Sequence, residues 1–342
     1  MVHQYINNGY HIVLDVNSGA IHVVDEVVYD VIPLFEKHSS EEITGLLREK
    51  YSEEEIREAV EEVAQLKKEG SLFTPDTYEA PLIDFKKRPT VVKALCLHIA
   101  HDCNLACRYC FAEEGEYHGR RALMSYETGK AALDFLIANS GSRRNLEVDF
   151  FGGEPLMNFE VVKQLVAYGR EQEKLHDKHF RFTLTTNGVL LNDDIMEFAN
   201  REMDNVVLSI DGRKEVHDHM RPFRKGAGSY DLIVPKFQKF AKSRNQEKYY
   251  VRGTYTHFNT DFSKDVLHLA DLGFKQISVE PVVAEETDDY AIKEEDLPVL
   301  FKEYDDLAAE MVRRNKAGNG FNFFHFMIDL EGGPCVYKRL SG

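Results

Sequence analysis

The chain has few cysteines, no tryptophan and no long apolar run. Its 342 residues include five cysteines and ten prolines. So few cysteines do not form the dense disulfide framework of small secreted domains, and a reducing cytoplasm fits them better. No apolar run approaches the roughly 18 residues of a membrane-spanning helix, and the first residues lack the basic and apolar regions of a signal peptide. The sequence therefore predicts a cytoplasmic protein that does not act on a membrane.

Positive charge is also scarce. Lysine and arginine total 42 against 58 aspartates and glutamates, which gives a formal net charge of −16. Proteins that bind nucleic acid need a basic surface, so nucleic acid is not expected as a partner. The composition is 43% apolar and 29% charged, an ordinary globular balance. The length suffices for one large domain and a small one.

Three of the five cysteines, Cys103, Cys107 and Cys110, lie within eight residues. At this spacing three thiolates can reach one metal centre, and no fourth protein ligand lies nearby. Soft sulfur ligands suit an iron–sulfur cluster. A [4Fe–4S] cubane held by three cysteines would leave one iron open, where a small molecule could bind and accept an electron.

Two other interpretations of these cysteines remain open. A structural zinc site needs a fourth ligand and usually uses paired CxxC motifs. The only later cysteine is Cys335, and the nearby alternatives for a fourth ligand are His98, His101 and His118. Cys107 and Cys110 could form a redox dithiol, but such motifs usually lack a third cysteine just upstream. The remaining cysteine, Cys96, lies in a predicted strand and is expected to be a buried core thiol.

Residues 1–73 predict a separate small domain. Strand-like runs at 10–14 and 20–24 flank a turn, and helical patterns begin near Asp25, Ser39 and Ser52. Residues 71–73 are expected to add a last strand. The order is typical of a winged-helix-like α+β domain, whose sheet edge could accept an extended peptide. Residues 74–92, which contain three prolines, predict a linker.

Residues 93–318 repeat a strand–helix unit six times. Apolar strand-like runs lie at 95–100, 146–151, 182–186, 206–210, 249–256 and 276–280. Helical patterns lie at 126–138, 159–173, 193–202, 230–242, 263–272 and 293–314. The alternation predicts a parallel sheet covered by helices, either open or curled into a barrel. In both forms ligands bind at the carboxyl ends of the strands, and the cysteines directly follow the first strand.

Polar motifs follow the next three strands. Gly152, Gly153 and Glu154 come after the second strand, and their backbone could approach the ammonium and carboxylate of an amino acid. A Thr-Thr-Asn-Gly motif at 185–188 follows the third. After the fourth, Ser209 and Asp211 are two residues apart and so lie on one face, which suits ribose hydroxyls. Each motif by itself is also a common turn.

The order of these motifs resembles the radical S-adenosylmethionine (SAM) superfamily over about residues 93–285. The resemblance implies a partial (β/α)₆ barrel and a [4Fe–4S] cluster on the three cysteines, with SAM on the open iron. It also implies SAM contacts for the methionine moiety (Gly152, Gly153, Glu154), the ribose (Ser209, Asp211), the adenine (Tyr109, Val282) and the carboxylate (Arg221). No catalytic general base is assigned, and His217 and His219 are expected to be structural or solvated.

Within that superfamily, residues 209–230 resemble peptide maturases that carry a cysteine-rich SPASM extension. Residues 4–73 resemble the element that binds leader sequences of ribosomal peptides. Together they resemble the maturases that form thioethers in six-cysteine (SCIFF-type) peptides, as sactipeptide enzymes do. The implied enzyme cleaves SAM to a 5′-deoxyadenosyl radical, abstracts hydrogen from a cysteine-rich precursor peptide and forms a thioether crosslink. The implied partners are that peptide, bound through its leader, and a donor such as flavodoxin or ferredoxin.

One departure concerns residues 319–342. SPASM extensions hold auxiliary clusters on many cysteines, but here only Cys335 follows the barrel, and one thiolate cannot hold a cluster. This segment is therefore expected to be the start of a truncated extension, with auxiliary [4Fe–4S] clusters only where the extension is intact. Alternative functions are another radical modification, such as epimerisation, carbon–carbon coupling or serine or cysteine oxidation, and a non-catalytic peptide-binding metalloprotein.

Overall fold

The computed structural model describes residues 1–76 and 90–327, which form two compact units. One unit is built from the residues before the gap and the other from residues 90–326. Most of the predicted linker, at 77–89, and most of the predicted extension, including Cys335, lie outside the described residues. No helix in the described ranges combines the length and the apolar character needed to cross a membrane.

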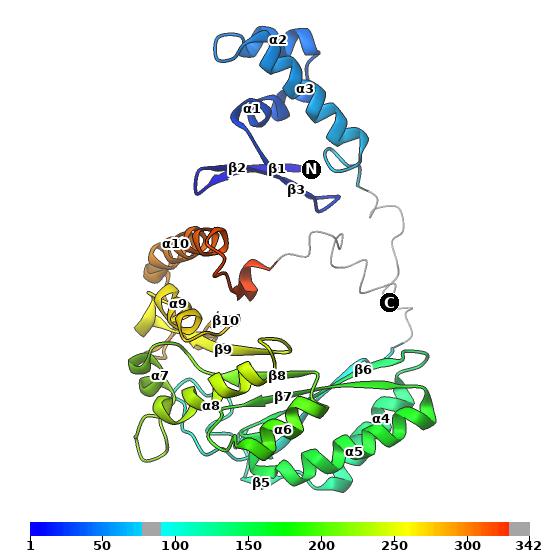
Figure 1. The fold of residues 1–342 in the computed structure, drawn as a ribbon, viewed down its shortest axis with the longest axis vertical. Helices are drawn as coiled ribbons and strands as arrows, with labels where there is room; N and C mark the ends of the chain where they lie inside the picture. Colours follow the sequence, from blue (N-terminus) through cyan, green and yellow to red (C-terminus); the bar gives the residue numbers. More distant parts are fainter. Residues whose placement is uncertain (77–89, 328–342) are drawn as a thin grey trace. The chain divides into compact units, whose positions relative to one another are not determined.

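The N-terminal unit is a three-stranded antiparallel sheet with three helices (Figure 1). Its strands, in the order β1-β2-β3, are β1 (Val2–Asn7), β2 (Tyr10–Asp15) and β3 (Ile21–Val24). Its helices are α1 (Glu26–Phe35), α2 (Ser40–Leu47) and α3 (Glu53–Lys68). Asp25, Ser39 and Ser52 accept hydrogen bonds from backbone amides at the three helix starts, as their capping patterns predict.

Two details of this unit differ from the sequence-based prediction. β1 was missed because its side chains do not alternate between apolar and polar. The strand predicted at residues 71–73 is wrong, because these residues form a bend in which Phe73 has a left-handed φ of 53°. The small α+β fold is confirmed, and its core contains the fully buried Val13, Val31 and Ile56.

The second unit is an eight-stranded sheet with helices on its outer side, a partial barrel whose two edges do not meet. The strand order is β11-β10-β9-β8-β7-β6-β4-β5, and all neighbours are parallel except the short edge strand β5. The strands are β4 (Ala94–His101), β5 (Ala122–Leu123), β6 (Asn145–Gly152), β7 (His179–Thr186), β8 (Asn205–Ser209), β9 (Tyr249–Tyr255), β10 (Gln276–Pro281) and β11 (Asn322–Phe323). All six predicted strands are present, and β11 lies in the segment predicted to begin the extension.

The helices of this unit are α4 (Tyr126–Asn139), α5 (Phe159–His176), α6 (Asp193–Glu202), α7 (Lys214–Met220), α8 (Tyr230–Ser243), α9 (Ser263–Asp271) and α10 (Leu297–Lys316). Six of them match the predicted helical patterns. The short helix α7 was not predicted. Helices α4, α5 and α6 lie on the same side of β6, β7 and β8 (Figure 1). Parallel strands joined by helices therefore confirm the predicted (β/α)₆ architecture.

The two faces of this sheet differ in chemistry. On the helix-covered face, Val148, Phe150 and Phe182 are fully buried. The alternate residues on the same strands point to the other face, where Asp149 and Arg181 are exposed. Cys96 lies on this second face and is exposed, so its prediction as a core thiol is wrong. The alternation of β4 decides this, because Leu97 and Ile99 occupy the helix-covered face instead.

Candidate functional site

A cavity of about 440 Å³ opens at the carboxyl ends of the parallel strands. The three clustered cysteines line it together with residues from the ends of β6, β7, β8, β9 and β10. The predicted site residues on its wall are Cys103, Cys107, Tyr109, Cys110, Gly152, Gly153, Ser209, Arg221 and Val282. Two others, Glu154 and Asp211, are fully buried behind this wall. The structure thus brings motifs from far-apart segments to one place.

The three thiols at this cavity have the donor set of an iron–sulfur cluster. They form no disulfide. Across residues 1–76 and 90–327, no three His, Cys, Asp or Glu side chains converge on a single ion site. A zinc ion would draw its sulfur ligands to about 2.3 Å from one centre, whereas a cubane binds each thiolate at a different iron. Three soft thiolates are a donor set that an iron–sulfur cluster uses, whereas a structural zinc site needs a fourth ligand.

Two of these thiols, Cys103 and Cys107, have raised pKa values when no metal is bound. Burial raises the pKa of Cys103 to about 12, with a further contribution from the Glu154 carboxylate. Burial also raises the pKa of Cys107 to about 11. A metal that binds here must displace these protons, as metals do when they bind cysteine.

The last residue of α7 and the segment after it hold the backbone of the cysteine loop. The N–H groups of Ala106 and Arg108 donate 2.9 Å hydrogen bonds to the carbonyls of Pro222 and Met220. The guanidinium of Arg224 donates two hydrogen bonds to the carbonyl of Cys103, from Nη2 at 2.8 Å and from Nε at 3.1 Å. Sequence reasoning missed Arg224, and the only signal was the likeness of residues 209–230 to peptide maturases.

The glycine pair after β6 lets two strand ends pack together. A Cβ on Gly152, whose φ is +121°, would lie 2.4 Å from the carbonyl oxygen of Ala100. A Cβ on Gly153 would lie 2.1 Å from that of Asp102. The N–H groups of Gly153 and Glu154 already donate to these two carbonyls, at 2.8 and 2.9 Å. The predicted opening toward a ligand is therefore only part of the reason for these glycines.

Glu154 joins this motif to the one after β7. Its buried carboxylate accepts hydrogen bonds from Thr186 Oγ1 and the Asn187 N–H, both at 2.8 Å, and from the Leu156 N–H at 3.0 Å. Burial raises the pKa of Glu154 above its ordinary value. With these partners the carboxylate is satisfied within the protein and acts on the cavity through the residues it holds.

Asp211 is likewise buried and fixes two residues of the cavity wall. Its two oxygens accept a shared hydrogen bond from the hydroxyl of Tyr109, at 2.7 and 2.8 Å. Nη1 of Arg221 donates to that hydroxyl at 2.8 Å and lies 3.9 Å from Asp211 Oδ1. Burial raises the pKa of Asp211 to about 6. Within the described residues, the buried Nε of Arg221 has no hydrogen-bond partner, so this cavity residue fits an anionic group.

His217 supports both Asp211 and Arg221 through hydrogen bonds. Its Nδ1 accepts the backbone N–H of Asp211 at 3.3 Å, so Nε2 carries the proton and donates to Ser229 Oγ at 2.9 Å. That hydroxyl donates to the carbonyl of Arg221 at 2.8 Å. Burial lowers the pKa of His217 well below its usual value, so the ring is neutral. His217 is therefore structural as predicted, whereas His219 is exposed.

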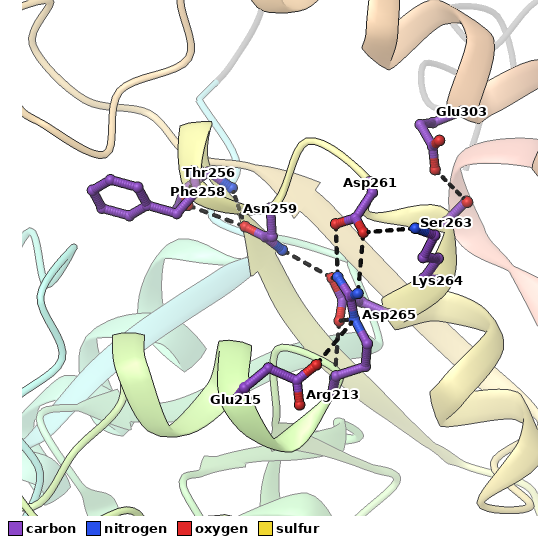
Figure 2. Close-up of polar contacts among 10 residues, drawn as sticks. All are labelled: Arg213, Glu215, Thr256, Phe258, Asn259, Asp261, Ser263, Lys264, Asp265 and Glu303. Carbon is purple, nitrogen blue, oxygen red and sulfur yellow. Dashed lines mark hydrogen bonds and ion pairs between the residues drawn. The ribbon is translucent and has the colours of Figure 1, made fainter.

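An ion-pair network braces the loop after β8 (Figure 2). The backbone N–H and Nε of Arg213 donate to Asp265 Oδ1 at 2.9 and 2.8 Å, and Nη2 donates to Asp261 Oδ1 at 2.7 Å. Asn259 Nδ2 donates to the other oxygen of the buried Asp265 at 3.0 Å. A Cβ on Gly212, whose φ is +143°, would lie 2.3 Å from the Asp265 Cβ. Only glycine therefore allows this close approach.

Two further cavity residues pair with each other. Nη2 of Arg252 lies 2.7 Å from Glu280 Oε2. Arg252 therefore has an internal partner for its charge. The half-buried Val282 lies beside this pair at the end of β10.

Comparison with known proteins identifies relatives of the second unit. The family model for the Radical SAM superfamily matches residues 97–272, which are 176 of the 342 residues. An uncharacterized protein of Methanocaldococcus jannaschii is 31% identical over 55% of this chain and 62% of its own length. The radical SAM cyclopropyl synthase TigE of Paramaledivibacter caminithermalis is 23% identical over 50% of this chain and 38% of its own. The match spans less than two thirds of either relative.

Solved structures share the fold. A structure of native anSMEcpe with bound AdoMet and Kp18Cys peptide has a TM-score of 0.59 and 19% identity, and covers 68% of this chain and 64% of that one. Streptococcus suis SuiB bound to S-adenosylmethionine has a TM-score of 0.51 and 17% identity, and covers 94% of this chain and 70% of its own. At these identities the likeness shows fold alone, and with SuiB it extends over both units.

The raised pKa of Asp211 predicts a pH-dependent stability difference for Asp211→Asn. Because the folded-state pKa of about 6 exceeds the ordinary 3.8, the native carboxyl holds its proton more tightly than the unfolded one. Its ionisation therefore lowers the stability of the wild type as pH rises between about 4 and 6, and asparagine lacks this cost. Relative to wild type, the free energy of unfolding of the variant should rise across that window by as much as about 3 kcal/mol.

Denaturant unfolding of the iron-free proteins at a series of pH values measures this difference. Asp289→Asn, which changes an exposed carboxyl, serves as the matched control. A difference between Asp211→Asn and wild type that stays constant across the window would contradict the assignment.

Proposed function

The chain belongs to the radical SAM superfamily, and from that premise we propose that it is a peptide maturase that forms cysteine thioether crosslinks in a ribosomal precursor. Membership implies a [4Fe–4S] cluster and SAM as cofactors. The observation that carries the proposal is the convergence of three thiols, Tyr109 and an under-bonded Arg221 on one cavity at the strand ends. Ligands bind at this end of parallel α/β sheets.

Different residues on the cavity wall would bind different parts of the cluster and of SAM. Cys103, Cys107 and Cys110 would hold the cluster. Arg221, with its free Nε, would bind the SAM carboxylate, and Tyr109 would present its ring to the adenine. Ser209 would contact the ribose, with Gly152 and Gly153 near the methionine moiety and Val282 near the base. Glu154 and Asp211 would act from behind the wall, because their carboxylates have internal partners.

When bound, the two cofactors supply one-electron cleavage of the sulfonium and a 5′-deoxyadenosyl radical that takes hydrogen from a substrate carbon. The protein contributes the orientation of the groups at the cavity. Tyr109 is held by Asp211, and the cysteine loop is held by the segment after α7. Such preorganisation keeps the reacting groups in place. The electron would come from an external donor such as flavodoxin or ferredoxin.

A peptide substrate is supported by both units. The anSMEcpe structure holds a bound peptide, and a further relative is the cysteine-type anaerobic sulfatase-maturating enzyme of Clostridium novyi. In the N-terminal unit, β1 and β3 are the edge strands of the sheet. An edge strand can pair with an extended peptide, so this unit would bind the precursor leader. Formation of the carbon–sulfur bond would release the thiol proton and one electron, and auxiliary clusters of an intact SPASM extension would accept that electron.

The cluster ligands are tested by replacing Cys103, Cys107 and Cys110 together with alanine. After anaerobic reconstitution, iron content and 5′-deoxyadenosine formation should fall to background, because no thiolate remains at the cavity. Cys96→Ala is the matched control, since it removes an exposed thiol outside the cavity, and it should keep both. Iron binding and SAM cleavage that survive in the triple variant would refute the ligand assignment.

The reaction type is tested by mass spectrometry of a cysteine-rich precursor peptide co-expressed with the enzyme. A thioether crosslink removes two hydrogens per bond and protects the cysteine from alkylation. Epimerisation leaves the mass unchanged, and carbon–carbon coupling lowers the mass but leaves the cysteine thiols open to alkylation. A modified peptide whose cysteines all react with iodoacetamide would overturn the thioether proposal. Zinc occupancy without nucleoside product would favour a non-catalytic binding protein.

The role of the N-terminal unit is tested by a chain that begins at residue 74. Without the unit, affinity for a fluorescent leader peptide should fall by about tenfold or more, because the strand-pairing edges are lost. SAM cleavage should persist, since the cavity is built from residues of the second unit. A scrambled leader is the control. Equal leader affinity of the two chains would count against recognition by this unit.

A further inference from the structure

The motif at the end of β7 contacts a cysteine directly. Asn187 is only 5% exposed, and its Nδ2 lies 3.5 Å from Cys103 Sγ. The backbone N–H of Leu105 donates to the same sulfur at 3.5 Å. Both are N–H···S hydrogen bonds to a residue on the cavity wall. Sequence reasoning assigned this asparagine to a turn and did not connect it to the cysteines.

The orientation of the Asn187 side chain is determined by its other contacts. Its Oδ1 accepts the N–H of Val189 at 3.1 Å, so the opposite side of the amide must be the NH₂ group. That group also donates to Asn104 Oδ1 at 2.7 Å. The backbone N–H of Asn187 is held by Glu154 at 2.8 Å. These three hydrogen bonds fix Asn187, so its amide already points its donor at the sulfur and loses little conformational freedom on binding it.

We propose that Asn187 donates a hydrogen bond to the Cys103 thiolate of the cluster and thereby raises the reduction potential of that cluster. Reduction adds negative charge to the iron–sulfur core, and donors to its sulfur ligands stabilise the reduced form more than the oxidised one. Asn187 also donates its backbone N–H to the carboxylate of Glu154, whose negative charge acts on the sulfur in the opposite direction. The inference rests on the proposed cluster at Cys103, Cys107 and Cys110.

The experiment compares the reconstituted wild type with Asn187→Leu, which removes the donor at similar volume. Iron and sulfide content is measured first, and the midpoint potential is then measured by spectroelectrochemistry without SAM. The variant should hold a full cluster whose midpoint potential is more negative than that of the wild type. Asn200→Leu is the matched control, because it makes the same change at an exposed asparagine on α6, and its potential should be unchanged.

A second variant keeps the test decisive if Asn187→Leu binds too little iron to be measured. Asn187→Asp keeps the shape of the side chain but replaces its donor by an oxygen and adds a negative charge, so its potential should be more negative than that of Asn187→Leu. An unshifted or more positive potential in a fully loaded variant would overturn the inference. So would a loss of SAM affinity with no change in potential, or two folded variants that bind no iron. Absence of iron from the wild type would instead refute the proposed function.

Discussion

The carboxylate of Asp211 is buried at the end of β8 and sets the positions of two residues on the cavity wall. A buried carboxylate is costly unless hydrogen bonds satisfy it. Here the hydroxyl of Tyr109 and the N–H of Thr254 supply them, and Arg221 shares the hydroxyl. Tyr109 lies between two of the cysteines in the chain, so the position of the thiols depends on the same buried group.

A second layer keeps Asp211 itself in place. His217 accepts its backbone N–H, and the ion pair between Arg213 and Asp265 anchors the next turn to α9. Functional residues on loops need such support, because a loop by itself does not hold a side chain to within a fraction of an ångström. The short helix α7 and the chain after it supply that support and also bind the backbone of the cysteine loop. Residues 209–230 therefore act as one platform for the site.

The acidic residues of the sequence motifs act mainly by positioning. Glu154 holds the Thr186 hydroxyl and the Asn187 backbone, and Asn187 in turn reaches the sulfur of Cys103. Asp211 holds Tyr109 in the same manner. In both cases a carboxylate behind the wall fixes a neutral donor or ring on the wall. The two carboxylates still act on the thiols through their charge, since Glu154 contributes to the raised pKa of Cys103 and Asp211 to that of Cys107.

Much of this architecture could be predicted from local pattern. The six strands, six of the seven helices of the second unit and the three helix caps of the first follow from periodicity and capping residues. β1 could not be predicted because its side chains do not alternate between apolar and polar, and α7 has only seven residues, too few for a clear helical period. The exposure of Cys96 was mispredicted because strand alternation shows that two faces exist but not which one the helices cover.

The sequence by itself determined the chemistry available at the site, because the identity and spacing of three cysteines are local properties of the chain. Only the tertiary structure decided which motif residues reach the cavity and which support it. Tyr109 and Asp211 are 102 positions apart, and Asn187 and Cys103 are 84 apart. Hydrogen bonds over such separations leave no local signal, since they depend on how the parallel strands align at one edge of the sheet.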